Sequence, residues 1–423
     1  MNFSISRLLI FYGIFIEVHL FISALWGADI LPNHKESTIP LKMLLFSYHA
    51  ANTILISFLA LYLQHKGLNG TEIGWVLATG PLASIFAQPF WGYLSDKFKT
   101  VKWILFICVL GLIIGSTIFF QMTTLISILI VAAIFYFFTT SIGGLGDSLA
   151  QRRADELKIN FGSIRTWGSI GFATSSLFIG LLLNYIGIQY IYWPYLFFGT
   201  IALIVILILK DVEVDRTPVQ IKDIKNIITN KPLIIFLLLI LFLTISHRAN
   251  DSFLGIYIVE LGGSESLVGI AWFVGVVTEA IVFATAIKWF KKYKTMVFII
   301  LSGIIYSIRW VLYAMVNDPI LIVGLQFMHG ISYGIFYVAA FEYITRLIPR
   351  LLQSTGHLVF YAIFFGFSGI VGSLLGGQVI EHFGGSKLYL LMGAFSFIGV
   401  ISLSLYHLFP KPLPKHHKKE RSQ

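Results

Sequence analysis

Hydrophobic residues in this chain run in long blocks that are separated by short polar segments. A block of about 20 apolar residues is long enough to cross a bilayer as a helix. Because lipid tails cannot pair with backbone amides, each block must satisfy its own hydrogen bonds, and an α-helix does so. The blocks predict twelve membrane spans, at residues 41–63, 71–94, 101–120, 124–150, 162–185, 190–209, 233–260, 265–287, 296–316, 319–347, 355–380 and 385–408.

The longest polar stretch inside the chain lies between the sixth and seventh spans. It predicts a linker at 210–232 between six-helix bundles at 41–209 and 233–408, with a basic tail at 409–423. An internal echo supports two related halves, because KFKTV from Lys97 recurs as KYKTM from Lys292, each directly before a new block. The predicted fold class is therefore an all-α polytopic membrane protein of two pseudo-symmetric bundles.

The first hydrophobic segment, within residues 1–40, does not fit this scheme. Residues 7–27 are long enough to span, yet they contain Glu17 and His19. Three interpretations stay open: an extra thirteenth helix, an interfacial or targeting segment, or a translation start further along, for example at Met43. We favour a peripheral segment or a later start.

Composition and charge support the membrane class. Hydrophobic residues make up 57% of the chain and charged residues 12%, whereas soluble domains carry about 25% charged residues. Lys and Arg concentrate in alternate loops, and the opposite loops offer only Lys66 and Lys387. The positive-inside rule then predicts that the linker and the C-terminus are cytoplasmic, in a bacterial cytoplasmic membrane. The net charge of +10 is thus topological, and no nucleic-acid partner is expected.

The motifs of several enzyme classes are absent from the sequence. It contains no G-x-x-x-x-G-K-[ST] phosphate loop, no H-E-x-x-H zinc motif and no G-x-S-x-G elbow. Cys108 is the single cysteine, so neither disulfides nor thiolate metal sites are expected. We expect no enzymatic activity and no cofactor, and an ion gradient is the expected energy source.

Ionisable residues inside the apolar blocks are the main functional signal. They are Asp147, Arg165, Glu279, Arg309 and His329. One charge at the bilayer centre costs about 2.5–3.5 kcal/mol on insertion scales, so such residues usually pair or line a hydrated pathway. Arg248 and Asp251 share one face of the seventh span at i, i+3, where a purely structural pair and a functional one both stay open.

The loop GYLSDKFK, from Gly92 to Lys99, resembles the signature of the major facilitator superfamily. The resemblance implies the 12-helix major facilitator fold. It also implies that Gly92, Asp96, Lys97 and Lys99 form a gating loop whose carboxylate contacts a neighbouring helix end. An ordinary basic loop is the alternative interpretation.

A second motif narrows the resemblance. FGSIRTWGSIGF, from Phe161 to Phe172 with Asp147 upstream, is similar to the lactose permease and 3-phenylpropionate-permease-like group of proton symporters. The resemblance implies that Asp147 and Arg165 hold the substrate, with Phe172 and Trp167 beside them. Phe172 stands where the sugar permease has a Trp, which weakens the case for a galactoside specifically.

The same resemblance extends to the second half. It implies that Glu279, Arg309 and His329 form the proton-coupling cluster. Ser332 stands where the group has a carboxylate, so another residue must titrate or the coupling must differ. Glu279 is our first choice for the titrating group and Asp251 the second.

These observations lead to one functional hypothesis and two alternatives. We expect a monomeric permease in the bilayer, a proton symporter that imports a small organic solute such as a sugar, a nucleoside or an aromatic acid. A proton-driven exporter on the same fold is the first alternative. A membrane-embedded sensor or enzyme without net transport is the second.

Overall fold

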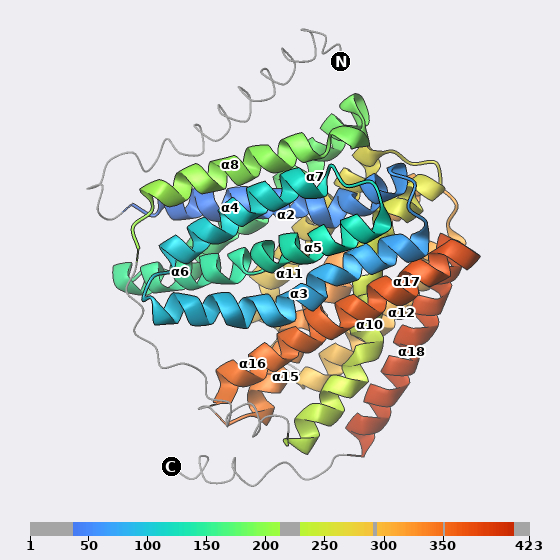
Figure 1. Ribbon diagram of the computed structural model, residues 1–423. Helices are drawn as coiled ribbons and strands as arrows, with labels where there is room; N and C mark the ends of the chain where they lie inside the picture. The colour runs from blue at the N-terminus through green and yellow to red at the C-terminus, as the bar shows by residue number, and fades with distance from the viewer. Residues whose placement is uncertain (1–36, 212–228, 291–293, 350–351, 410–423) are drawn as a thin grey trace, which may run out of the picture.

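The computed structural model describes residues 37–211, 229–290, 294–349 and 352–409 (Figure 1). The possible extra helix before residue 37, most of the predicted linker and the basic tail lie outside the described residues. Within the described ranges all regular structure is helical, and twelve stretches are long and apolar enough to cross a membrane. The fourth span ends at residue 157 where 150 was predicted, and the bounds of the others fall within three residues of the prediction, so the twelve-span prediction is confirmed.

The first six spans come from eight helical segments: α2 (Ile39–His65), α3 (Gly70–Lys97), α4 (Lys102–Phe119), α5 (Leu125–Thr139) with α6 (Ile142–Leu157), α7 (Phe161–Ile186), and η1 (Ile188–Tyr190) with α8 (Tyr192–Ile208). The last six are α10 (Lys231–Glu260), α11 (Glu265–Trp289), α12 (Thr295–Met315), α13 (Pro319–Leu325) with α14 (Phe327–His329), η3 (Gly330–Gly334) and α15 (Ile335–Leu347), then α16 (Gln353–Tyr361) with η5 (Ala362–Phe367) and α17 (Ser368–Phe383), and finally α18 (Gly385–Leu408).

Several helices begin at residues whose side chains satisfy the free amides of a first turn. Asn69 caps α3 in a full capping box, because its side chain accepts from the Glu72 amide while the Glu72 carboxylate accepts from the Asn69 amide. The side chains of Asn160 and Asn230 accept from the Gly162 and Leu233 amides, and so cap α7 and α10 without a capping box. The polar residues between the apolar blocks therefore set where the spans start.

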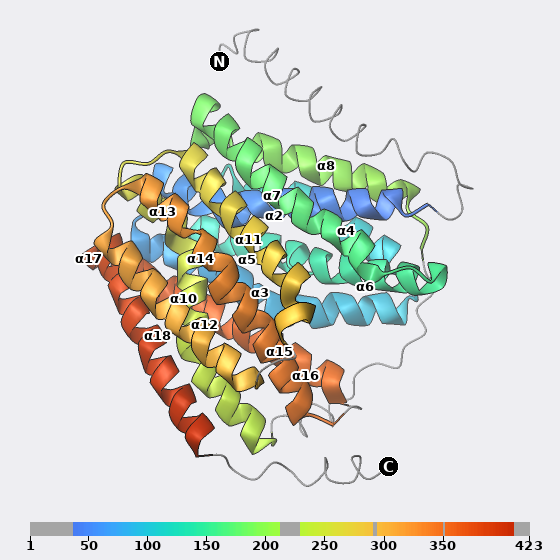
Figure 2. The ribbon, with the colours of Figure 1, turned by 180° about the vertical axis from the view of Figure 1, so that it is seen from behind.

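The twelve spans form two groups that meet along three pairs of helices. Helices of the first half, coloured blue to green, and of the second half, coloured yellow-green to red, each pack mainly among themselves (Figures 1 and 2). Between the halves, α7 packs on α11, α3 on α17 and α2 on α10. The two groups approach each other at the right of Figure 1 and splay apart toward its lower left.

The two ends of the molecule differ in their loops and in how tightly the halves meet. We call the end with the connections 66–69, 120–124, 261–264 and 316–318 the short-loop end. At this end the halves touch backbone to backbone: a Cβ added to Gly74 would lie 2.5 Å from the Ser373 carbonyl oxygen, and one added to Gly269 would lie 2.2 Å from that of Ser176. The opposite end, the basic end, carries Lys97, Arg153, Lys210, Lys294 and Arg346.

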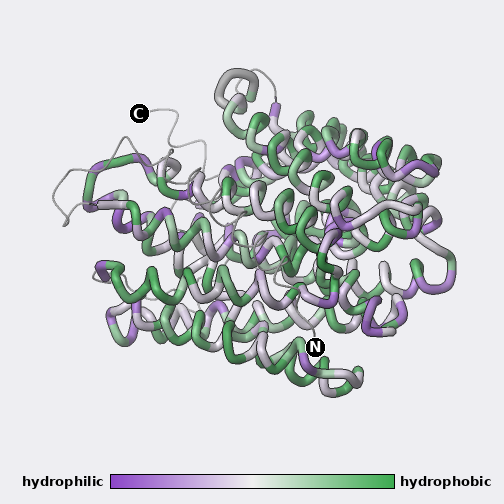
Figure 3. Tube along the Cα trace, turned by 90° about the horizontal axis from the view of Figure 1, so that it is seen from above, coloured by the Kyte–Doolittle hydropathy of each residue, from purple (hydrophilic) through white to green (hydrophobic). Residues whose placement is uncertain are grey.

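Apolar side chains cover the outer surface of the spans. Large hydrophobic residues such as Ile130, Ile208, Leu238 and Phe397 are more than half exposed or close to it. Figure 3 shows hydrophobic residues along the helices and hydrophilic ones concentrated at the loops. An apolar outer surface of this extent is stable in lipid and not in water, as expected for a multi-pass membrane protein.

Candidate transport site

The Asp147 carboxylate and the Arg165 guanidinium form an ion pair between α6 and α7. Arg165 Nε lies 3.0 Å from Asp147 Oδ1 and donates a hydrogen bond to Oδ2 at 3.2 Å. The predicted pair is therefore formed, and with side chains 37% and 33% exposed it is not fully enclosed by protein. A charged pair that lies inside an apolar block without being fully enclosed is the arrangement expected along a pathway for a polar solute.

His49 on α2 is a third polar group at this place, and it was not predicted from the sequence. A Cβ added to Gly168 would lie 2.5 Å from His49 Cδ2 and 2.7 Å from an Arg165 guanidinium nitrogen. Only glycine at position 168 therefore lets the imidazole and the guanidinium come together. His49 Nε2 is buried and has no hydrogen-bond partner within the protein.

Two aromatic rings meet where α7 of the first half packs on α11 of the second half. Phe172, two turns along α7 from Arg165, meets Trp272 of α11 edge-on with the ring centroids 6.0 Å apart. Trp272 also lies 6.3 Å from the His329 ring, and its indole Nε1 is buried without a partner. Trp272, another residue that the sequence analysis missed, thus lies between the two polar clusters. Trp167 is half buried and, two residues after Arg165, points to a different side of α7.

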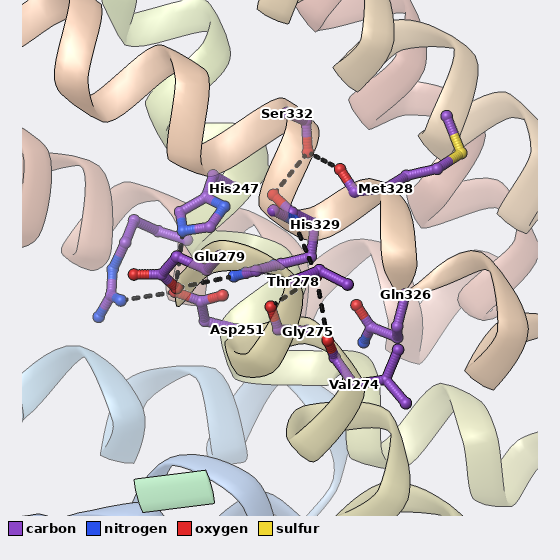
Figure 4. Close-up of polar contacts among 12 residues, drawn as sticks. His247, Asp251, Val274, Gly275, Thr278, Glu279, Gln326, Met328, His329 and Ser332 are labelled. Carbon is purple, nitrogen blue, oxygen red and sulfur yellow. Dashed lines mark hydrogen bonds and ion pairs between the residues drawn. The ribbon is translucent and has the colours of Figure 1, made fainter. Parts of the chain in front are cut away.

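A second polar cluster fills the interior of the C-terminal half (Figure 4). Glu279 Oε2 on α11 lies 3.5 Å from His329 Nε2, and His329 Nδ1 lies 3.4 Å from Arg309 Nη1 on α12. The sequence predicted Glu279 directly beside Arg309; the structure brings the three residues together with the imidazole between the other two. Glu279 is also close enough to Arg165 for the two charges to interact across the interface between the halves.

Arg309 is fully buried, with 0% of its surface exposed. Its guanidinium donates to Gln326 Oε1 at 2.6 Å and to the Tyr313 hydroxyl at 3.3 Å, and it lies over the Trp310 ring at 4.4 Å. None of the ion pairs among the described residues includes Arg309. A buried cation held only by neutral groups is costly, so a negative charge nearby, as Glu279 provides through His329, is favoured.

Ser332 does not replace the missing carboxylate. Its hydroxyl donates to the Met328 carbonyl oxygen at 2.7 Å, one turn back along the same span. A serine bonded in this way has no ionisable group to exchange a proton. Any titrating carboxylate in this cluster must therefore lie on another helix, as Glu279 on α11 does.

The tenth span is distorted where it contacts Glu279. Its helix changes at Gly330 into one π-type turn, η3, a distortion that is frequent at functional sites. A Cβ added to Gly330 would lie 2.3 Å from the Thr278 carbonyl carbon and 2.6 Å from the Glu279 amide. The absence of a side chain at Gly330 thus permits the close approach that brings His329 to Glu279.

A third polar group lies on α10. Asp251 Oδ2 is 2.7 Å from Arg248 Nη1, as the i, i+3 spacing predicted, and 3.5 Å from Nε2 of His247, which the sequence analysis did not single out. His247 Nδ1 contacts the Tyr306 hydroxyl at 3.1 Å. The i, i+3 spacing of the two charges on one helix was visible in the sequence, but the link through His247 to other helices was not.

The predicted gating loop contains the end of α3. Asp96 lies 3.9 Å from Arg152 on α6, and the Lys97 ammonium lies over the Tyr93 ring at 5.9 Å. Lys99 adopts a left-handed backbone conformation, with φ of 52°, and a Cβ at Gly92 would touch nothing within 4 Å. The carboxylate at the first amides of α4 is that of Asp211, which accepts from Val101 and Lys102 at 3.2 and 3.1 Å. Asp96 therefore contacts a basic residue of α6 in this conformation, and Asp211 occupies the helix start.

Comparison with known proteins places the whole arrangement in a family. A family model described as the MFS_1 like family matches residues 38–391. The chain belongs to this family. It is 30% identical over 372 residues to the uncharacterized transporter YwbF of Bacillus subtilis (strain 168), a match that covers 86% of this chain and 91% of YwbF. The maltose permease of Geobacillus stearothermophilus is 28% identical over 397 residues, which covers 90% of this chain and 95% of the permease.

A solved structure agrees with the fold. The crystal structure of the nucleoside transporter NupG superposes with a TM-score of 0.80 at 17% sequence identity, over 88% of this chain and 99% of that one. Membership of the family confirms the predicted major facilitator fold. It also confirms that the chain is a multi-pass membrane transporter of a small solute and not an enzyme.

Proposed function

We propose that this transporter is a monomeric proton symporter that imports a small hydroxylated solute, a saccharide, through alternating access of a site between its two halves. The observation that carries this proposal is that Arg165 and Glu279, which lie on opposite sides of the interface, are near enough for their charges to interact. Arg165 is also paired with Asp147. One cation thus faces two carboxylates, one in each half.

The solute site is proposed at the ion pair and the unpartnered groups around it. Buried polar atoms without a hydrogen-bond partner are rare in proteins and call for an explanation. His49 Nε2 and Trp272 Nε1 are two such atoms. His49 and Arg165 both pack against Gly168, and the Trp272 ring meets the Phe172 ring. Hydroxyl groups, which both donate and accept, complement an imidazole nitrogen, an indole N–H, a carboxylate and a guanidinium together.

The saccharide class is supported by the chemistry of this site and by the similarity to a maltose permease. The Phe172 and Trp272 rings offer an apolar surface of the kind on which a sugar ring stacks. A nucleoside also carries ribose hydroxyls and a flat base, and the fold match to a nucleoside transporter makes it the second candidate.

Proton coupling is proposed through competition for Arg165. When Glu279 is ionised, it attracts Arg165 away from Asp147 and weakens the grip on the solute. When Glu279 is protonated, Arg165 is left to Asp147 and the solute. Solute binding and protonation of Glu279 then favour one another, which is the linkage that symport requires.

Alternating access is proposed to begin from a conformation closed at the short-loop end. Besides the glycine contacts, the Gly70 amide on α3 donates to Glu381 Oε2 on α17 at 2.6 Å, which joins the two halves there. The positive-inside rule assigns the basic end to the cytoplasm, so this conformation is closed to the outside. Import would require these contacts to open and the opposite end to close.

Transport into proteoliposomes under an imposed pH gradient tests the proposal. The full-length protein is reconstituted and given radiolabelled maltose, sucrose, uridine and 3-phenylpropionate in parallel. We expect gradient-driven accumulation of a saccharide that vanishes when an ionophore collapses the gradient. Efflux against the solute gradient would indicate the exporter alternative, and chemical conversion without any gradient would indicate an enzyme.

Glu279→Gln tests the coupling role within the same assay. The amide cannot carry a proton but keeps the shape of the carboxyl group, so we expect loss of accumulation with solute exchange across the membrane retained. Glu342→Gln is the matched control, because Glu342 pairs with Arg346 near the basic end of α15. Normal accumulation by Glu279→Gln would refute the assignment.

A further inference from the structure

The group formed by His247 and Asp251 on α10 is not used by the mechanism above. The His247 side chain is 4% exposed, and the Asp251 side chain is 11% exposed. Asp251 Oδ2 holds both Arg248 at 2.7 Å and His247 at 3.5 Å, whereas Asp251 Oδ1 is buried without a hydrogen-bond partner. A fixed ion pair would leave this buried oxygen without a hydrogen-bond partner, whereas a proton bound to the carboxyl group would satisfy its need for a partner.

Residues from several helices surround this group. The His247 imidazole stacks on the Tyr333 ring of η3, with centroids 4.5 Å apart and planes at 3°, and its ring lies 5.6 Å from that of His329. The titratable and charged groups that face His247 or Asp251 are Arg248 on α10, Tyr306 and Arg309 on α12, His329 on α14, Tyr333 on η3 and Tyr389 on α18. The group is therefore continuous with the Glu279 cluster (Figure 4).

The interior of the C-terminal half thus holds two carboxylate–imidazole pairs side by side. In both, an Nε2 atom lies 3.5 Å from a carboxylate oxygen: His329 with Glu279, and His247 with Asp251. The remaining ring nitrogen of each histidine contacts α12, at Arg309 and at Tyr306 respectively. The same helix therefore orients both imidazoles.

The position of Asp251 lets helix movement control its access to water. Arg248 lies 5.7 Å from the Phe365 ring of η5, and Gly369 of the same span packs against both Arg248 and Pro81 of α3. This is the contact between α3 and α17, one of the three along which the halves meet. A movement that separates these helices would uncover the Arg248–Asp251 pair.

We propose that Asp251, held by His247, is a second proton-carrying carboxylate of this transporter, in place of the ionisable group that Ser332 lacks. This inference rests on the proposed proton-coupled function. Asp251 takes a proton from water on the side where the halves are open, which forms its O–H bond. It returns the proton to water after they reverse, which breaks that bond, and no other reactant is needed. His247 acts as a positioning residue, whose Nε2 stays beside the Asp251 carboxyl group when Arg248 moves away.

The competing explanation is a static Arg248–Asp251 ion pair. Removing one partner of a buried pair leaves an unpaired charge, whereas removing both is often tolerated. We would compare Asp251→Asn, Arg248→Gln and the double variant Arg248→Gln/Asp251→Asn in proteoliposomes, with radiolabelled maltose as the probe. A proton carrier predicts that Asp251→Asn and the double variant both lose gradient-driven accumulation while solute exchange continues. A static pair predicts that the double variant regains accumulation, and that result would overturn the proposal.

Infrared difference titration of the full-length protein in lipid gives a readout that needs no solute. A protonated carboxyl group shows a C=O stretching band that disappears on ionisation. We expect Asp251→Asn to remove one pH-dependent component of this band, and His247→Gln to shift the pH at which that component titrates. An unchanged pH-dependent band in Asp251→Asn would overturn the proposal. If Glu279→Gln keeps accumulation, the proposed function itself fails; if Glu279→Gln loses it and the Arg248→Gln/Asp251→Asn variant keeps it, only the second site fails.

Discussion

Gly377→Ala should shift the transporter away from the conformation seen here, because its new methyl group has no room where α17 meets α3. The added Cβ would lie 2.4 Å from the Gly70 carbonyl oxygen and 3.0 Å from the Gly74 Cα atom. Both contacts are with backbone, so no side chain can rotate out of the way. The helices must separate at the short-loop end before the methyl group can fit.

The size of the shift follows from the cost of overpacking. Inserting a methyl group into a closely packed contact costs about 1–3 kcal/mol. If only the conformation closed at the short-loop end carries this cost, its population relative to the open one falls by roughly 5- to 150-fold. A transporter held open on one side cycles slowly, so we also expect slower net transport.

Cysteine accessibility measures this shift directly. Ser176 is fully buried between α7 and α11 near the same end, and Cys108 is buried in α4. In a Cys108→Ser background, a membrane-impermeant thiol reagent should label Ser176→Cys slowly in otherwise unchanged protein and much faster when Gly377→Ala is added. Gly324→Ala is the matched control, since a Cβ there meets nothing within 4 Å. Equal labelling rates in a well-folded Gly377→Ala protein would refute the closed-end assignment.

Three further predictions concern the clusters and the contact between the halves. Gly330→Ala should push η3 away from α11 and separate His329 from Glu279, so that solute accumulation falls more than solute exchange and the protein loses about 1–3 kcal/mol of stability. Gly324→Ala on the same span should leave accumulation and stability unchanged. Equal thermal midpoints and equal transport rates for the two variants would contradict this prediction. Arg165→Lys should weaken solute binding in equilibrium dialysis, because an ammonium cannot offer a planar fork to both Asp147 and a solute, while Lys97→Arg should bind normally. Glu381→Gln should modestly raise the rate at which Ser176→Cys is labelled, because a neutral amide accepts the Gly70 hydrogen bond less strongly than a carboxylate does. Slower labelling would argue against this contact as part of the closed end.

The fold could be predicted from the sequence because the bilayer leaves the chain few alternatives. Each apolar block must form a helix, and Asn69 or Asn160 marks where a helix begins. The break of the tenth span at Gly330 was not predicted, because it depends on the backbone of α11, more than fifty residues away in sequence.

The charged residues of the candidate site were also visible in the sequence, since a charge in an apolar block is conspicuous. The structure brings Asp147 to Arg165 and Glu279 to His329. The neutral partners His49, His247 and Trp272 were missed. A histidine or tryptophan in an apolar block follows no spacing rule, and its importance comes from which distant helix packs against it. Trp167 was favoured by its motif alone, and helical geometry turns it away from Arg165.

Proton uptake on solute binding tests the central claim most directly, because that claim is that Asp147 and Glu279 compete for Arg165. Purified protein in weakly buffered detergent solution, with a pH indicator, would be mixed with the saccharide that it transports. The account predicts that binding draws protons from solution in the unmodified protein and that Glu279→Gln binds the same saccharide without this uptake. Binding without proton uptake in the unmodified protein, or the same uptake in Glu279→Gln, would contradict it.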